Sequence, residues 1–203
     1  MNGKLIILEG GEGAGKSTAI KLLKPILPPD TVFTREPGGT PEAERLREIL
    51  KHDDLNPLTQ LLGFFAARAD HYSKVIGPAL MAGRHVVSDR LDGSTYAYQV
   101  WAGSSGELHA EFFRLRRLVC EPPPDFYVYL DVDPEVGLRR SRVAGNQDRI
   151  ERMDPEFHRQ VREGYHLFME RFARRRGVTI DANRSPNEVE DEVIQVIRPV
   201  LAQ

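Results

Sequence analysis

The chain of 203 residues has little of several features that define other protein classes. Its one cysteine, Cys120, excludes an internal disulfide and is compatible with a reducing cytosol. Its apolar runs are short: "LIIL" at 5–8 is too short for a signal-peptide core, and no run approaches the ~20 residues that span a bilayer. We therefore expect a cytoplasmic protein with no membrane partner.

The chain also lacks an excess of one charge. It has 28 Lys and Arg against 30 Asp and Glu, for a net charge of −2. This balance gives no support for a nucleic-acid partner, because nucleic-acid binders present a basic surface. A hydrophobic fraction of 40% is ordinary for a globular protein. We expect a single domain over 1–203, long enough to bury a full core.

Apolar strands alternate with helices along the chain. Strands are expected at 4–9, 31–36, 85–89, 125–132 and 178–181. Helices are expected at 15–24, 40–51, 56–83 and 154–176, with others starting near 133 and 185. This alternation predicts an α/β fold with a five-stranded parallel sheet flanked by helices. Ligands of such sheets bind beyond the carboxyl ends of the strands.

The segment "GGEGAGKST" fits the phosphate-binding pattern G-x-x-x-x-G-K-[ST] and lies between an apolar strand and a helix. Glycine backbone N–H groups close around phosphates, Lys16 can reach the β- and γ-phosphates, and Ser17 can bind Mg²⁺. A glycine-rich turn with an exposed lysine is the alternative, which the flanking strand and helix disfavour. The predicted ATP ligands are Gly10, Gly11, Glu12, Gly13, Ala14, Gly15, Lys16, Ser17 and Thr18.

Asp89 and Arg90 end the third apolar strand. The Asp89 carboxylate is a candidate second ligand for Mg²⁺, although an Asp at a strand end is often a helix cap. Arg90 can neutralise a transferring phosphate, or form a surface ion pair. A guanine-specific switch protein should carry an [NT]-K-x-D motif, which this sequence lacks. A GTPase switch is therefore disfavoured.

Further motifs resemble the thymidylate kinase family, which phosphorylates dTMP to dTDP with ATP. They are "TREPGGT" (34–40), "FFAAR" (64–68), "DRLDGSTYAYQ" (89–99), "YLDVDPEVGLRR" (129–140), "DRIE" (148–151) and "IDAN" (180–183). These matches run in order over nearly the whole chain. The resemblance implies a nucleoside monophosphate kinase fold with a small lid, of the bacterial type with arginines in the lid.

The resemblance also implies an acceptor site. Phe64 matches the aromatic that stacks on thymine, and Arg68 matches the arginine that contacts the base O4; without the family, Phe64 would read as core. Tyr98 matches the filter against a ribose 2′-hydroxyl, and Glu12 matches a carboxylate near the deoxyribose. The full set of predicted dTMP ligands is Glu12, Glu36, Arg47, Phe64, Arg68, Arg90, Ser94, Thr95, Tyr98 and Gln99.

The resemblance places a lid at about 140–153, where a family arginine reaches the γ-phosphate. We favour Arg142 in that role, with Lys16 and Arg90 as the other catalytic residues; a solvated charged face is the alternative for each lid arginine. Arg140, Arg149 and Ala182 complete the predicted ATP ligands. The family also implies a homodimer.

The sequence departs from the family pattern at a few positions. Leu91 replaces an aromatic or His after "DR", Val100-Trp101 replaces a small stretch, and Ala144 stands where another lid arginine is expected. The open alternatives are a kinase for another or modified pyrimidine deoxynucleoside monophosphate, and a catalytically weak nucleotide-binding protein.

Overall fold

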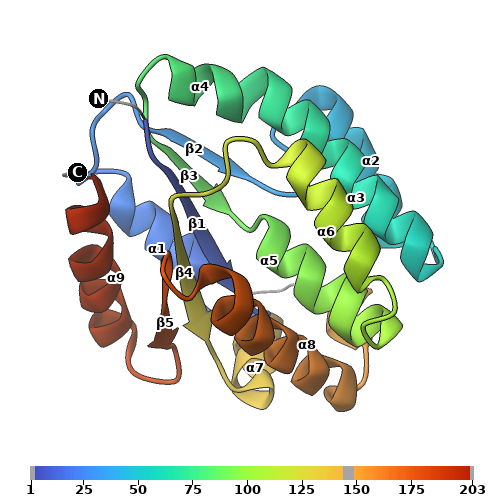
Figure 1. Cartoon of the computed structure of the whole chain (residues 1–203). Helices are drawn as coiled ribbons and strands as arrows, with labels where there is room; N and C mark the ends of the chain where they lie inside the picture. The colour runs from blue at the N-terminus through green and yellow to red at the C-terminus, as the bar shows by residue number, and fades with distance from the viewer. Residues whose placement is uncertain (1–2, 144–148, 202–203) are drawn as a thin grey trace.

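A computed structural model of the chain describes residues 3–143 and 149–201. Its centre is a five-stranded parallel sheet in the order β2-β3-β1-β4-β5 (Figure 1). The strands are β1 (Leu5–Gly10), β2 (Val32–Arg35), β3 (Val86–Asp89), β4 (Phe126–Asp131) and β5 (Gly177–Asp181). The register pairs Leu8 with Asp89 and Gly10 with Leu130, so β1, β3 and β4 end along one edge of the sheet. The predicted sheet is confirmed.

Alternate residues of β1 serve two separate apolar cores, because successive side chains of a strand point to opposite faces. Leu5 and Ile7 pack with helices of one face, and Ile6 and Leu8 pack with helices of the other. The first face is covered by α3 (Pro57–His71), α5 (Asp92–Thr95), α6 (His109–Val119) and α8 (Pro155–Phe168). The second is covered by α1 (Lys16–Leu23) and α9 (Pro186–Leu201), and the two groups stand on opposite sides of the sheet in Figure 1.

Two further helices flank the edge where the strands end. Helix α2 (Pro41–His52) packs against α3, and α7 (Pro134–Val143) follows β4 and contacts α8. The predicted N-cap Thr40 accepts a hydrogen bond from the Ala43 N–H at 3.1 Å, with Pro41 in the first turn. This cap fixes where the loop after β2 ends and α2 begins.

The long helices predicted at 56–83 and 154–176 are interrupted. The first consists of α3, a π-helical segment (η1, Tyr72–Ile76) and α4 (Gly77–Met81). The second consists of α8 and a π-helical segment (η4, Met169–Ala173), and a third such segment (η2, Tyr96–Ala102) continues α5. A short 3₁₀ segment (η3, Ile150–Arg152) precedes α8. Hydrophobic periodicity does not reveal a π turn, because it shifts the register by a single residue.

Among the described residues, no helix combines the length and the apolarity that crossing a bilayer requires.

Candidate active site

Two cavities open at the edge where the strands end. The first, of about 710 Å³, lies over the phosphate loop and is called here the loop cavity. The second, of about 190 Å³, is lined by Phe64 and Arg68 and is called the Phe64 cavity. Five charged side chains line both cavities: Glu12, Arg47, Lys51, Asp89 and Arg90. The cavities therefore meet at these residues, which form the junction.

The loop cavity is lined mainly by the segment that the sequence predicts for phosphate. Residues 12–18 line it, together with Arg140 from α7 and Ala182 from the turn after β5. Gly10 and Gly11 are absent from the lining, and their carbonyls instead accept hydrogen bonds from Lys16 Nζ, both at 2.9 Å. Helix α9 contributes Val189, Glu190 and Val193, which the sequence did not predict.

The phosphate loop owes its shape to glycine. Gly13 and Gly15 have φ angles of 64° and 95°, in the left-handed region that side chains disfavour. A Cβ on Gly13 would stand 2.0 Å from the carbonyl oxygen of Gly137 in α7. The loop therefore packs backbone to backbone against the helix that leads to the predicted lid.

Lys16 is 8% exposed at the floor of the loop. Burial, aided by the charge of Arg90, lowers the pKa of Lys16 from 10.5 to about 8. A polyphosphate bound on the loop would raise this pKa again, since a nearby anion stabilises the ammonium form.

Arg90 has a left-handed backbone, with φ of 70°. This conformation costs a side-chain residue about 1–2 kcal/mol, so its surroundings must impose it. The Arg90 N–H donates to the Leu8 carbonyl at 2.9 Å, and the Leu91 N–H donates to Glu9 Oε1 at 3.0 Å. The Arg90 carbonyl accepts a bond from Ser88 Oγ at 2.8 Å. Its position at the junction of the cavities is thus fixed through the backbone.

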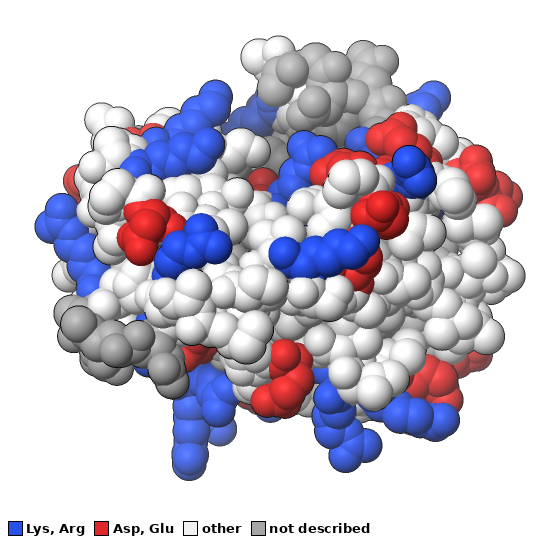
Figure 2. All heavy atoms as spheres, turned by 90° about the horizontal axis from the view of Figure 1, so that it is seen from above, with Lys and Arg blue, Asp and Glu red and all other residues white. Residues whose placement is uncertain are grey.

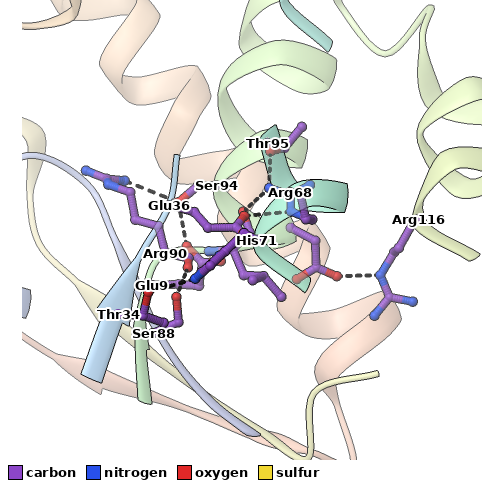
Figure 3. A network of polar contacts seen from close by, with 12 residues as sticks. Glu9, Thr34, Glu36, Arg68, His71, Ser88, Arg90, Ser94, Thr95 and Arg116 are labelled. Atoms are coloured by element: carbon purple, nitrogen blue, oxygen red, sulfur yellow. Dashed lines mark hydrogen bonds and ion pairs between the residues drawn. The ribbon is translucent and has the colours of Figure 1, made fainter. Parts of the chain in front are cut away.

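The guanidinium of Arg90 is held as firmly as its backbone. Nη1 donates to the Gly10 carbonyl at 2.9 Å and to the Tyr165 hydroxyl at 3.0 Å. Nη2 donates to Glu12 Oε1 at 3.2 Å. Figure 3 shows Arg90 beside Ser94, Glu9 and Ser88 at the ends of the central strands.

Glu12 turns away from the phosphate side of its own loop. Its Oε1 accepts bonds from the Tyr98 hydroxyl at 2.9 Å and from Arg90. Burial acts to raise the pKa of Glu12, but the charges of Arg90 and Lys16 outweigh burial and lower it. The carboxylate therefore stays ionised where the two cavities meet.

The Phe64 cavity contains every residue that the sequence predicts for the acceptor. Phe64 itself is only partly buried, whereas its neighbour Phe65 is 2% exposed and belongs to the core. Arg47 lines the cavity while donating to the Pro37 carbonyl at 2.7 Å. Tyr96, which has no match in the family motif, packs among core aromatic rings.

Arg68 is the most constrained side chain of the Phe64 cavity, at 1% exposure. Its Nε donates to Glu36 Oε2 at 2.7 Å, and its Nη2 donates to the Leu91 carbonyl at 2.9 Å and Thr95 Oγ1 at 2.8 Å. Burial opposes the charge of Arg68, but the Glu36 carboxylate and other nearby acidic groups together outweigh burial and raise the pKa of Arg68. Among the described residues, the buried Nη1 has no hydrogen-bond partner.

Comparison with known proteins identifies the family. The thymidylate kinase family model matches residues 8–193. The chain belongs to the thymidylate kinase family. It is 40% identical to the thymidylate kinase of Haemophilus ducreyi, over 99% of this chain and 96% of that protein. It is 44% identical to that of Synechococcus sp., over 97% of this chain and 96% of that protein.

A solved structure agrees with the sequence comparison. The crystal structure of a thymidylate kinase from Ehrlichia chaffeensis superposes with a TM-score of 0.79 at 31% identity. The match covers 98% of this chain and 100% of that chain. The predicted nucleoside monophosphate kinase fold is therefore confirmed.

The departures from the thymidylate kinase pattern affect the pocket unequally. Leu91 is 1% exposed, lines the Phe64 cavity, and gives its carbonyl to Arg68. Val100 is fully buried in the core, and Trp101 donates from Nε1 to Glu163 at 3.1 Å. Only the first of these departures lies on the described wall of the Phe64 cavity.

The arginines expected from the thymidylate kinase lid are spread over different places. Arg140 donates to the Ala182 carbonyl at 2.7 Å, on the wall of the loop cavity. Arg149 lines the Phe64 cavity and not the loop cavity, and its contact with ATP stays a prediction. Arg142 is exposed and, in the described part of the chain, lines neither cavity. Ala144 and the central lid lie outside the described residues.

Sequence reasoning missed three residues that support the site. Glu9 is fully buried, His71 is fully buried beside Glu36, and Tyr165 contacts Arg90. A carboxylate ending an apolar strand was a signal for Glu9. For His71, the signal was its spacing of three residues from Arg68, which places both on one helix face. Tyr165 had no local signal, since it reaches the site from α8.

Proposed function

We infer that this chain transfers the γ-phosphate of ATP to dTMP, giving dTDP and ADP. The observation that carries this inference is the meeting of the two cavities at one charged junction. A donor bound in the loop cavity and an acceptor bound in the Phe64 cavity would present their phosphates to the same arginines. Membership of the thymidylate kinase family supports the identity of both nucleotides.

The donor half fits ATP. Phosphates would take the backbone N–H groups of the loop, whose glycines leave room for close approach, while the N-terminus of α1 faces the same charge. The adenine would lie near Ala182 and Arg140, which line the far part of the loop cavity.

The acceptor half fits a thymine nucleotide. The ring of Phe64 offers an apolar face for a planar base. Arg68 would donate to the base O4, whereas the amino group of cytosine at that position is itself a donor and would leave the arginine donor unpaired. Tyr98 and Glu12, joined by their hydrogen bond, would lie against the sugar. Ser94, Thr95 and Gln99 complete the wall.

Phosphoryl transfer depends on positioning and on charge neutralisation, with little covalent chemistry for the protein. An oxygen of the acceptor phosphate would attack the γ-phosphorus in line, breaking the bond to the leaving ADP. Lys16 and Arg90 would hold the charge that spreads over the phosphoryl oxygens, and Arg47 would hold the acceptor phosphate. No strong general base is needed, because this phosphate is already ionised.

Mg²⁺ belongs to the proposal, with Asp89 and Ser17 as its protein ligands. Asp89 Oδ1 is buried without a hydrogen-bond partner in the described part of the chain, and it faces the junction. The described residues hold no cluster of three or more metal-binding side chains. The pair of Asp89 and Ser17 suits Mg²⁺, which proteins bind through one or two carboxylates plus substrate phosphates and water. Bound there, the ion would neutralise the phosphates of the donor.

Arg142 stays the proposed lid arginine and 140–153 the proposed lid, because Arg142 directly follows Arg140 and Ser141 of α7, which line the loop cavity. Removing it should slow the transfer step while leaving dTMP binding unchanged. Closure of a lid would also exclude the water that hydrolyses ATP.

A homodimer is the proposed assembly, and a single domain in the cytoplasm the proposed setting. Helices α2 and α3 pack together and expose Ile49, Leu58 and Leu62, each 45–49% accessible. A second copy could cover them. Sedimentation velocity of the wild type and of Leu62→Lys tests the dimer.

The charges on the surface favour a small-molecule substrate over nucleic acid. On the face seen in Figure 2, Lys and Arg (blue) are interspersed with Asp and Glu (red), whereas nucleic-acid binders present a basic surface.

The test of function is coupled ADP production with a panel of monophosphates: dTMP, dUMP, dCMP and dGMP. We expect dTMP to give the highest kcat/KM, and chelation of Mg²⁺ to abolish turnover. Absence of dTMP-stimulated turnover, with dTMP and ATP still binding by calorimetry, would contradict the proposal.

A further inference from the structure

Among the described residues, Arg68 has one nitrogen, Nη1, without a hydrogen-bond partner. The contacts that orient its guanidinium extend beyond the Phe64 cavity to His71 and Thr34. Glu36 faces Arg68 with one oxygen only: Oε2 accepts from Nε, and Oε1 lies 3.0 Å from His71 Nδ1. The other imidazole nitrogen, Nε2, lies 2.7 Å from Thr34 Oγ1 on β2. Figure 3 shows the resulting chain of contacts from Thr34 through His71 and Glu36 to Arg68 and Thr95.

The direction of the hydrogen bonds follows from the groups involved. Glu36 is paired with Arg68 and only accepts, so His71 Nδ1 carries the proton and donates to Oε1. In the neutral ring, Nε2 then accepts from the Thr34 hydroxyl. His71 is fully buried, and Gly39 closes over it, since a Cβ there would stand 2.4 Å from Nε2. The imidazole is therefore held in a single position, in which Nδ1 donates to Glu36.

Without the His71 donor, a different pairing becomes available. A carboxylate beside an arginine prefers to accept two parallel N–H bonds. With Oε1 released, Glu36 could turn to take both Nε and Nη2. Nη2 would then give up its bond to the Leu91 carbonyl or to Thr95, and the guanidinium plane, with Nη1, would move. His71 occupies the oxygen that this alternative needs.

We propose that His71 is a positioning residue for base selection: it holds Glu36 in one-oxygen contact with Arg68 and so fixes the plane of the Arg68 guanidinium at the wall of the Phe64 cavity, where the acceptor base would bind. The proposal rests on the proposed function for the identity of the base. The position of the arginine itself can be tested without any substrate.

The first test measures Arg68 in the free protein. The exchange rate of its Nε–H with water is followed by ¹⁵N NMR, with the signal assigned through its loss in Arg68→Lys. In His71→Phe, which keeps a ring but removes both hydrogen bonds, exchange should be faster by about tenfold or more. His71→Asn retains a donor near the place of Nδ1 and should stay close to the wild type. Unchanged exchange in His71→Phe would overturn the proposal.

The second test measures selectivity. In His71→Phe, kcat/KM for dTMP should fall through KM, and its ratio to that for dCMP should narrow by about tenfold, since hydrogen-bonded base reading is what rejects the wrong partner. The KM for ATP should change less than twofold, and His71→Asn should recover most of the ratio. Equal losses for dTMP and dCMP would show a packing effect only and overturn the role in selection.

A matched control separates selection from folding. His109→Phe makes the same change in a histidine that contacts Tyr96 and Phe113, away from the Phe64 cavity. Its selectivity ratio should equal that of the wild type. If the wild type shows no dTMP-stimulated turnover, the proposed function fails, while the exchange measurement still decides whether His71 positions Arg68. Should His71→Phe not fold, Thr34→Val removes the Nε2 partner and gives the same readouts.

Discussion

The loop cavity and the Phe64 cavity are built from different material. The loop cavity takes its phosphate-binding part from one short stretch of chain, and mostly from its backbone. The Phe64 cavity takes side chains from β2, α2, α3, β3 and η2, and holds them with other side chains. A backbone site accepts any polyphosphate, whereas a site of oriented side chains can choose a base. The division teaches which half carries catalysis and which carries selectivity.

The halves also differ in what keeps them in place. Left-handed glycines and the contact of Gly13 with Gly137 shape the loop. In the Phe64 cavity, the buried ion pair of Arg68 and Glu36 needs further polar partners, because isolated buried charges are costly. Substitutions in the loop cavity should therefore lower the rate of phosphoryl transfer, whereas substitutions in the Phe64 cavity should affect stability and acceptor binding.

The largest effect is expected in the loop cavity. Lys16→Met removes the cation at the transferring phosphate and should lower kcat by about 10³-fold, a magnitude typical for loss of a charge stabiliser. Binding of dTMP, measured by calorimetry, should change less than threefold. A comparable loss of dTMP affinity would mean that the two halves are not separable.

The next effect is on stability in the Phe64 cavity. Arg68→Met leaves the Glu36 carboxylate buried without its main partner and should cost about 3–5 kcal/mol of unfolding free energy. Adding Glu36→Gln should recover much of this loss, as measured by urea denaturation of both single variants and the double variant. Additive losses would show that the pair contributes packing rather than charge.

Glu9 links the halves and should make stability depend on pH. Burial raises the pKa of Glu9 from 4.5 to about 7, so between these values the folded chain binds a proton that the unfolded chain has lost. Stability from this group is fully present below pH 4.5 and is lost as pH rises through 7, by up to about 3 kcal/mol. Glu9→Gln cannot titrate, so its stability relative to the wild type should rise between pH 5 and pH 8. An equal difference in unfolding free energy between Glu9→Gln and the wild type at both pH values, measured by urea denaturation, would contradict this.

The smallest effect tests Glu12, one of the charged residues that line both cavities. Glu12→Gln keeps the shape of the side chain but weakens its pairing with Arg90 and should raise the KM for dTMP by about tenfold, since hydrogen bonds to charged groups contribute about 1.5–3 kcal/mol. The KM for ATP should change less than twofold. Equal losses for both substrates would assign Glu12 to the shape of the phosphate loop.

Prediction from sequence succeeded where the signal is local. The phosphate loop, the Thr40 cap and the five strands each depend on neighbouring residues, and they lie within two residues of their predicted bounds. Prediction was weakest where contacts join distant segments. Glu9, His71 and Tyr165 were missed as supports of the site, because their partners lie on other segments of the chain.

Sequence patterns were sufficient to predict the fold class, the phosphate loop and a set of acceptor residues that all line one pocket. The orientation of these side chains could be seen only in the folded chain. Three features depend on partners 23–86 residues away in the sequence. They are the choice of the Glu36 oxygen that faces Arg68, the left-handed backbone of Arg90, and the hydrogen bond between Glu12 and Tyr98. The physical reason is that a hydrogen bond fixes a direction as well as a distance, and the chain brings its donors and acceptors together only when it folds.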